Sequence, residues 1–246
     1  MRTAYHFPVP LKKGIIRNRP NRFVMHVEFK GKLLRCRCPS PTKIGKIKFS
    51  ATPCLLSANS VGGTTTHTVE AIGIKDVTGH RHWVGINQTR INDICRYFIK
   101  AGMLNKLTHG EPLTKGKRIG KSVIDFASPK TILEIKAPLT VLPSFGKKTA
   151  NYAHQGDYER TIRHCRLLTQ QAKIGKRAIL LLAYLYLAPE FNPLRQNATN
   201  QRFITCISKA ALSGVEFWQA NFLFSKTGVQ LGRCCKLRLA TGKPNE

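Results

Sequence analysis

The sequence predicts a mixed α/β protein in which a region of short strands precedes a region of alternating strands and helices. Short segments punctuated by Pro and Gly follow one another from Arg22 to about Trp83. Beyond Trp83, apolar residues recur at helical spacing in several segments, with apolar runs typical of buried strands between them. At 246 residues the chain can form one large domain or two modest ones.

The first region is predicted to be a small barrel or sandwich. Residues 22–29 and 32–38 read as two strands, and the Lys30-Gly31 pair between them favours a hairpin turn. Pro and Gly separate the later segments from one another. Further short strands are expected over 46–50, 66–75 and 82–87.

The second strand of this hairpin alternates cleanly. Leu34, Cys36 and Cys38 fall on one face of it. Arg35 and Arg37 fall on the other face. This pattern is typical of a half-buried sheet whose outer surface is basic.

The second region is predicted to contain three helices and several strands. The first helix is expected to start at Asn92, as its N-cap, and to stop at Gly102. The long apolar run at 177–187 is typical of a strand in the middle of a sheet. Strands are also expected over 121–127, 131–137, 215–225 and 229–239, and helices over 157–173 and 201–212.

The charge of the chain indicates a polyanionic partner. Lys and Arg number 41 against 12 Asp and Glu, giving a net charge of +29. Such an excess suits phosphate contacts, so we expect DNA as the partner, with RNA as an alternative. The residues expected to contact it are Arg22, Arg35, Arg37, Lys43, Lys46 and Lys48.

Other classes of protein and site are disfavoured. No apolar run reaches the roughly 18 to 20 residues of a membrane-spanning helix, and the N-terminus lacks a signal peptide, so a cytoplasmic location is expected. The 8 Cys lack the spacing of a zinc site and are expected to be core thiols, so no structural zinc is expected. No glycine-rich phosphate loop is present, so no nucleotide cofactor is expected.

Two carboxylates and a lysine interrupt otherwise apolar strands. If the turn centres on Pro129 and Lys130, Asp125 faces Glu134, with Cβ atoms about 4.5 to 5.5 Å apart. Lys136 falls on the same face as Glu134. Charged groups in such strands are costly unless they are paired or bound to a ligand.

This arrangement matches the core of the PD-(D/E)xK nucleases. Asp125 and Glu134 could share Mg²⁺ or Mn²⁺, and Lys136 could assist the attack of water on phosphorus. The three would then be catalytic residues. The alternative is a structural ion pair between the lysine and one of the carboxylates.

The chain resembles the sugar fermentation stimulation protein A family over nearly its whole length. The resemblance implies an OB-like barrel over 1–83, a PD-(D/E)xK-type domain over 84–246, and non-specific DNA binding with a proposed role in regulating sugar, notably maltose, metabolism. It rests on short motifs in order: Arg22-Phe23, Cys38-Pro39, Val84-Gly85-Ile86-Asn87, Ile124-Asp125-Phe126, Glu134-Ile135-Lys136, Glu159-Arg160 with His164, and Gly214-Val215-Glu216.

The chain departs from the family pattern at three places. Residues 40–42 are Ser-Pro-Thr where the family has Asn-Thr-Gly, Tyr97 stands where a Glu is frequent, and Ile162 replaces a glutamine. Glu159 and His164 remain as candidates to support the metal ligands from the later helix. A helix-face ion pair is the alternative for these two residues.

Three functions therefore stand as hypotheses. The first is a DNA-binding protein, the second a metal-dependent nuclease that uses Asp125, Glu134 and Lys136, and the third a structural RNA-binding protein. The third leaves the opposed carboxylates unexplained.

Overall fold

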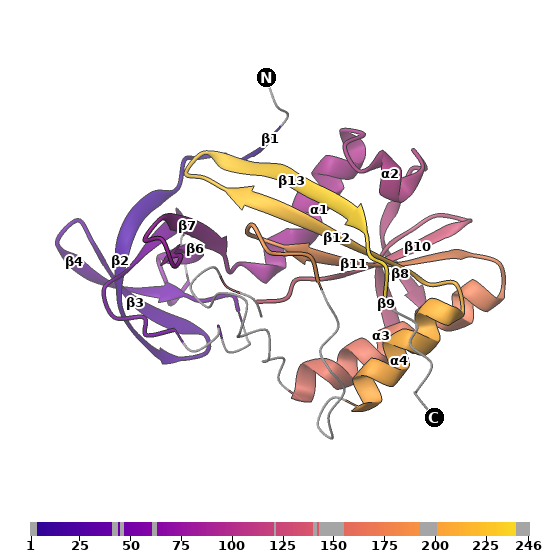
Figure 1. The fold of residues 1–246 in the computed structure, drawn as a ribbon. Helices are drawn as coiled ribbons and strands as arrows, with labels where there is room; N and C mark the ends of the chain where they lie inside the picture. Colours follow the sequence, from indigo (N-terminus) through magenta and orange to yellow (C-terminus); the bar gives the residue numbers. More distant parts are fainter. Residues whose placement is uncertain are drawn as a thin grey trace.

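The computed structural model describes residues 4–40, 44, 47–60, 63–120, 122–139, 142, 155–191 and 201–239. A barrel and a larger sheet lie end to end, and helices cover both faces of the larger sheet (Figure 1). The predicted mixed α/β fold, with an N-terminal OB-like barrel followed by a mixed sheet, is confirmed. Within the described residues, no helix is both long and apolar enough to cross a membrane.

The barrel is a six-stranded sheet in the order β4-β3-β2-β5-β6-β7. A parallel pairing between β4 and β6 closes five of these strands on themselves. Closure removes the open edges that an isolated small sheet would expose. The strands are β2 (Lys12–Asn21), β3 (Val24–Phe29), β4 (Lys32–Arg37), β5 (Thr52–Ala58), β6 (His67–Lys75) and β7 (Arg81–Gly85).

The predicted hairpin between β3 and β4 is confirmed. Phe29 pairs with Lys32, so the turn holds two residues. Lys30 and Gly31 have φ of 51° and 72°, the left-handed values that a type I′ turn requires. Along β4, Cys36 is buried and the flanking arginines are exposed, as the alternation predicts.

One predicted barrel strand is wrong. Residues 47–50 form no strand, and the strand of this part of the barrel is β5, which contains Pro53. Pro53 does not break this strand, since it is the second residue of β5 and pairs with Ile15 of β2. The long strand β2 was not predicted.

The larger sheet has seven strands in the order β1-β13-β12-β11-β10-β9-β8. The apolar strand β11 runs parallel to both of its neighbours near the centre, as predicted for this run. Strand β1 joins this sheet although it precedes the barrel in the chain. The strands are β1 (Ala4–His6), β8 (Thr114–Ile119), β9 (Ser122–Ala127), β10 (Thr131–Lys136), β11 (Arg177–Tyr184), β12 (Glu216–Phe224) and β13 (Gly228–Lys236).

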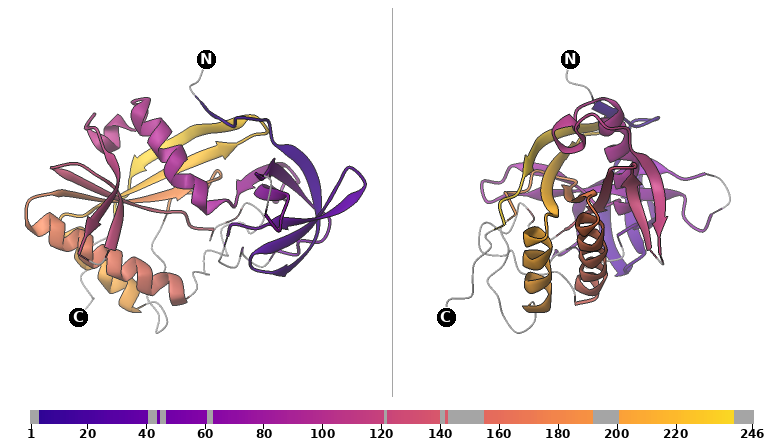
Figure 2. Two further views of the ribbon diagram at one scale, coloured as in Figure 1. Left: turned by 180° about the vertical axis from the view of Figure 1, so that it is seen from behind. Right: turned by 90° about the vertical axis from the view of Figure 1, so that its right-hand side faces the viewer.

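Helices pack on opposite faces of the larger sheet. On one face α3 and α4 run side by side, and α1 and α2 lie on the other (Figures 1 and 2). The first helix starts at Ile91, not at an Asn92 cap, because the turn of 3₁₀-helix before it continues into the helix. The helices are η1 (Gln88–Arg90), α1 (Ile91–Lys100), α2 (Asn105–Thr108), α3 (Gln155–Lys173) and α4 (Gln201–Leu212).

The barrel and the larger sheet share part of one core. Leu55 and Ala71 of the barrel belong to the same buried cluster as Phe224 of the sheet. The two backbones are in direct contact at Gly85, whose N–H donates to the Leu185 carbonyl at 2.8 Å. A Cβ there would lie 2.7 Å from both Leu185 and Phe224, so a larger residue would push the two parts of the molecule apart.

Candidate functional site

Strands β9 and β10 bring the predicted carboxylates together. The ladder pairs Ala127 with Ile132 and Phe126 with Leu133, which is the register that the turn predicts. The pairing of β9 with β10 extends no further than Phe126 and Leu133. The N–H of Ile135 instead donates to Oδ2 of the Asp125 side chain at 2.8 Å. The carboxylate thus lies where the two strands separate.

The other oxygen of Asp125 is held by helix α1. Asn92 donates from Nδ2 to Oδ1 of Asp125 at 2.8 Å. The sequence reasoning had given Asn92 a capping role and so missed this contact. The only available signal was a polar side chain in the first turn of an amphipathic helix.

Glu134 lies at the centre of a buried polar cluster. It is only 2% exposed. Its Oε1 contacts both Lys136 Nζ and His164 Nδ1, and the latter two atoms are 3.1 Å apart. Its Oε2 is buried without a hydrogen-bond partner among the described residues. An unpaired carboxylate oxygen at this depth is costly, and a ligand would satisfy it.

The surroundings shift the pKa values of the two carboxyl groups in opposite directions. Burial, and then the charge of Glu134, raise the pKa of Asp125. Burial alone would also raise the pKa of Glu134, but the His164 hydrogen bond and the Lys136 charge outweigh it and lower the pKa. The surroundings therefore favour the charged form of Glu134 and disfavour that of Asp125, whose charge a nearby cation would stabilise.

The carboxylates of Asp125 and Glu134 suit a divalent cation that takes its remaining ligands from water or phosphate. Within the described part of the chain, no group of three or more His, Cys, Asp or Glu side chains is arranged to hold a metal. Two carboxylates with water or phosphate oxygens in the remaining positions is the arrangement that Mg²⁺ accepts. The free Oε2 of Glu134 is the protein atom best placed for such an ion.

The structure separates the two residues expected to support this pair. His164 joins the cluster, whereas Glu159 pairs with Arg202 of α4 at 3.0 Å on the surface. Five positions along a helix turn a side chain by about 140°, so the two residues face different ways. Tyr97 packs against Tyr5, with ring centroids 5.8 Å apart, and supplies no ligand.

The predicted basic residues lie on the barrel surface where they are described. Arg35, Arg37 and Lys48 are exposed. Arg22 lies over the ring of Phe23 at 4.8 Å, and that ring is 54% exposed. Lys43 and Lys46 lie outside the described residues.

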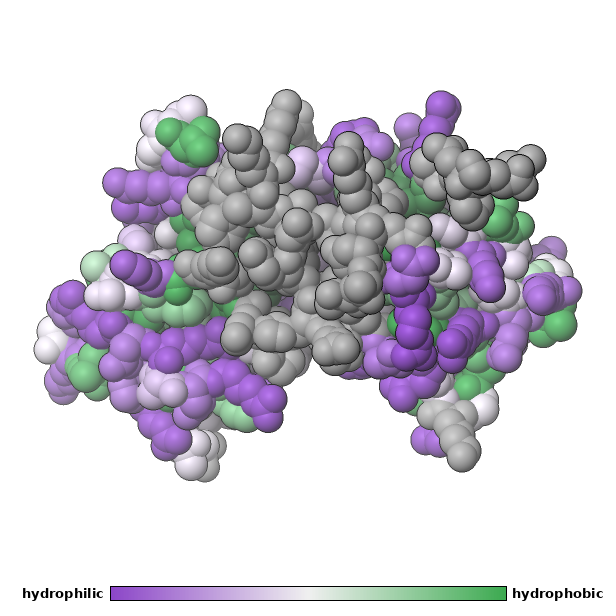
Figure 3. Space-filling model, turned by 60° about the horizontal axis from the view of Figure 1, so that its bottom comes forward, coloured by the Kyte–Doolittle hydropathy of each residue, from purple (hydrophilic) through white to green (hydrophobic). Residues whose placement is uncertain are grey.

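A second basic surface was not predicted. Arg160, Arg163 and Arg166 follow one another every three residues along α3 and are exposed. His164, on the same helix, turns inward to Glu134, so one helix carries both this surface and a member of the carboxylate cluster. Figure 3 shows hydrophilic residues gathered at both ends of one face of the molecule, at the barrel and at the opposite, helical end.

Comparisons with known proteins agree with the resemblance seen in the sequence and with the observed fold. A sugar fermentation stimulation protein homologue of Synechococcus sp. (strain JA-2-3B'a(2-13)) is 26% identical over 234 residues, covering 92% of each chain. Another, from Shewanella sp. (strain W3-18-1), is 23% identical over 249 residues, covering 95% of this chain and 99% of its own. The chain is a homologue of the sugar fermentation stimulation proteins. No family model matches it.

A solved structure shares the fold of this homologue. SfsA of Pyrococcus furiosus, in complex with Ca²⁺, superposes with a TM-score of 0.69 at 20% identity. The match covers 94% of this chain and 96% of the archaeal one. The barrel and the larger sheet are therefore both part of the shared architecture.

Proposed function

We propose that this homologue binds DNA through its basic surfaces and holds a divalent cation at Asp125 and Glu134. The observation that carries the proposal is the buried Glu134 oxygen without a partner, in a cluster to which α3 contributes His164 and on whose exposed side the same helix carries a row of arginines. A polyanion held by the arginines would present phosphate oxygens beside the carboxylates. A link to sugar metabolism, which the names of the relatives suggest, belongs to the same proposal.

The charge of the surface supports non-specific contacts with phosphate. Phosphate contacts fix the position of a nucleic acid but do not read its sequence. Arg22 stacked on the exposed Phe23 adds a flat surface on which a base could stack. Single strands and duplexes are both compatible with these features, and RNA remains the alternative substrate.

A salt series tests the binding. We expect affinity for unrelated duplexes to fall steeply with salt, with a slope of about −0.9 per phosphate contact. Arg35→Ala and Arg163→Ala should each reduce the slope by about 1. Lys100→Ala removes an exposed cation from α1 and is the matched control. Weak binding with a flat slope would contradict the proposal.

Binding of a divalent cation is supported from two directions. Asp125 and Glu134 provide oxygen ligands of the kind that Ca²⁺, Mg²⁺ and Mn²⁺ prefer. The archaeal structure was solved in complex with Ca²⁺. Calorimetric titration of the protein with Ca²⁺ and with Mn²⁺ should give one site per chain, which Glu134→Gln abolishes. Equal binding by the parent and this variant would exclude the site.

A second candidate function is metal-dependent cleavage of the bound DNA. When bound, a divalent cation polarises a phosphate oxygen and lowers the pKa of its water. Lys136, adjacent to both Glu134 and His164, would stabilise charge that develops on phosphorus. Nicking of supercoiled DNA in Mn²⁺ should occur with the parent and fall at least a hundredfold with Asp125→Asn. Equal rates would leave the protein as a binding protein only.

A further inference from the structure

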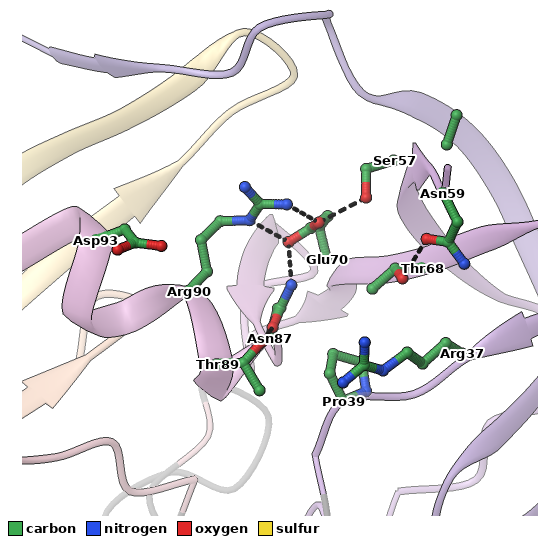
Figure 4. A pocket seen from close by; sticks show the side chains of 11 residues that line it. Arg37, Pro39, Ser57, Asn59, Thr68, Glu70, Asn87, Thr89, Arg90 and Asp93 are labelled. Carbon is green, nitrogen blue, oxygen red and sulfur yellow. Dashed lines mark hydrogen bonds and ion pairs between the residues drawn. The ribbon is translucent and has the colours of Figure 1, made fainter. Parts of the chain in front are cut away.

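A polar pocket lies where the barrel meets the start of α1, separate from the carboxylate pair. Its volume is about 300 Å³, and strands β4, β5 and β6 line it together with η1 and α1 (Figure 4). That volume is at the small end of the range of ligand pockets, which suits a molecule the size of one monosaccharide. The sequence reasoning assigned nothing here except Arg37.

A buried ion pair fixes one wall of the pocket. Glu70 of β6 is fully buried and accepts two hydrogen bonds from Arg90, at 2.6 and 3.0 Å. Ser57 Oγ donates to it at 2.6 Å and Asn87 Nδ2 at 2.8 Å. Both carboxylate oxygens of Glu70 therefore have hydrogen-bond partners within the protein. Glu70 positions the side chains of this wall and does not offer an unpaired charge to a ligand.

Charges of opposite sign remain at two ends of the pocket. The side chain of Arg37 forms no ion pair or hydrogen bond with any other residue that the structure describes, so its guanidinium is available. Asp93 is half-exposed, and its Oδ1 accepts from Lys115 at 3.0 Å. Figure 4 shows Arg37 extending toward Asn87 and Thr89, with Asp93 at the far end beyond Arg90.

Most of the remaining residues that line the pocket carry hydroxyl or amide groups. Of the described residues around the pocket, only Pro39 and Ala58 lack a polar side chain, and none is aromatic. A nucleobase is recognised chiefly by stacking on a flat side chain, and this pocket offers none. A ligand with hydroxyl groups over its whole surface and one anionic group matches the lining better.

We propose that this pocket binds a sugar-phosphate unit, with the phosphate at Arg37 and the sugar hydroxyls toward Thr89 and Asp93. Guanidinium groups bind phosphate oxygens through paired, charge-assisted hydrogen bonds. A carboxylate such as Asp93 accepts hydrogen bonds from sugar hydroxyls and repels a phosphate, so the two ends orient the ligand. A free hexose phosphate and the backbone of a nucleic acid both contain this unit.

Titration calorimetry on the full chain tests the site and distinguishes its two sources. One arm uses glucose 6-phosphate, with glucose and inorganic phosphate as comparisons, and the other a single-stranded tetranucleotide. For whichever of these two ligands binds the pocket, Arg37→Ala should weaken the affinity about tenfold or more, because the hydrogen bonds between the guanidinium and the phosphate are lost. Thr89→Val, which changes no charge, should weaken it about two- to tenfold.

Lys32→Ala is the matched control, because Lys32 is exposed on the same strand and does not line the pocket. Binding of glucose 6-phosphate that responds to Arg37 and Thr89 but not to Lys32 supports a free sugar phosphate. The same pattern with the tetranucleotide alone supports the nucleic-acid backbone. Equal losses with Lys32→Ala and Arg37→Ala, no effect of Thr89→Val, or inorganic phosphate binding as tightly as glucose 6-phosphate would overturn the proposal.

These outcomes do not depend on the carboxylate pair. Loss of salt-dependent DNA binding in the parent would contradict the proposed function while leaving the glucose 6-phosphate result intact. Since Arg37 and Thr89 are both exposed, the variants should retain the fold, and circular dichroism checks this.

Discussion

Two buried glutamates interrupt apolar strands in this molecule, and their surroundings differ. Glu70 of β6 receives hydrogen bonds from Ser57, Asn87 and Arg90, so both of its oxygens are satisfied. Glu134 of β10 has Lys136 and His164 at one oxygen, and its other oxygen has no partner among the described residues. The first is a complete structural ion pair, whereas the second leaves one carboxylate oxygen without a partner among the described residues.

The difference lies in where the partners come from. Arg90, in the turn before α1, presents a planar guanidinium that matches the Glu70 carboxylate with two hydrogen bonds. Lys136 is a point charge two residues from Glu134 on the same strand and reaches only one oxygen. The hydrogen bonds of Glu70 are complete, so a structural role explains it, whereas the incomplete hydrogen bonds of Glu134 are what motivates the proposed cation site.

The largest expected effect is on the complete pair. Glu70→Gln leaves the Arg90 guanidinium without its charge partner, and we expect the free energy of unfolding to fall by about 3 kcal/mol. Denaturant-induced unfolding measures this. A loss below about 1 kcal/mol would mean that Glu70 is not the structural partner described above.

The next effect separates the two glutamates by their response to metal. Ca²⁺ at about 100 times its dissociation constant should raise the free energy of unfolding of the parent by about 2.7 kcal/mol. Glu134→Gln should lose this increment, and Glu70→Gln should retain it despite its lower stability. Thermal unfolding with Ca²⁺ and with chelator gives both values, and retention of the increment by Glu134→Gln would remove the distinction between the two sites.

A smaller effect concerns the pH dependence of stability through Asp125. Its pKa is raised in the folded protein above the ordinary 3.8, so the folded state binds more protons than the unfolded state between those two values. Its contribution to the free energy of unfolding should therefore fall as pH rises from about 3.8 and level off above the folded pKa. Asp125→Asn should abolish this decline in metal-free protein, and an unchanged pH profile would show that Asp125 is ionised as in water.

The smallest expected effect concerns an exposed ion pair, which serves as a reference for the buried pair of Glu70 and Arg90. Arg17 and Glu28 form an ion pair on the barrel surface with side chains 49% and 42% exposed. Solvent screens such a pair, so Glu28→Gln should change the free energy of unfolding by less than about 1 kcal/mol. The same unfolding measurement serves as the control for Glu70→Gln, since both variants remove a carboxylate that faces an arginine.

Much of the fold was predictable because local patterns were strong. The two-residue turn at Lys30-Gly31, the apolar strand at 177–187 and the helix over 201–212 each follow from periodicity and turn chemistry. Strand β2 and the course of β5 were missed. Strand β5 pairs on both sides, and its pairing with β2 includes Pro53, whose local propensity disfavours a strand.

The site was partly predictable for the same reason. Charges in apolar strands marked Asp125 and Glu134, and the same criterion applied to Glu70 in the apolar stretch at 69–72 would have found the second buried glutamate. Neither the contact of Asn92 with Asp125 nor the placement of the arginine-bearing helix α3 next to Glu134 through His164 could be foreseen. Both depend on which helix packs on which face of the sheet.

The sequence by itself determined the class of fold, the charge that favours a polyanionic partner, and the position of the costly carboxylates along the strands. These depend on periodicity and composition, which are local properties. Only the tertiary structure decided which carboxylate is satisfied and which has a free oxygen. Hydrogen bonds saturate at specific distances and angles, so whether a buried group is complete depends on partners that the chain brings from distant positions.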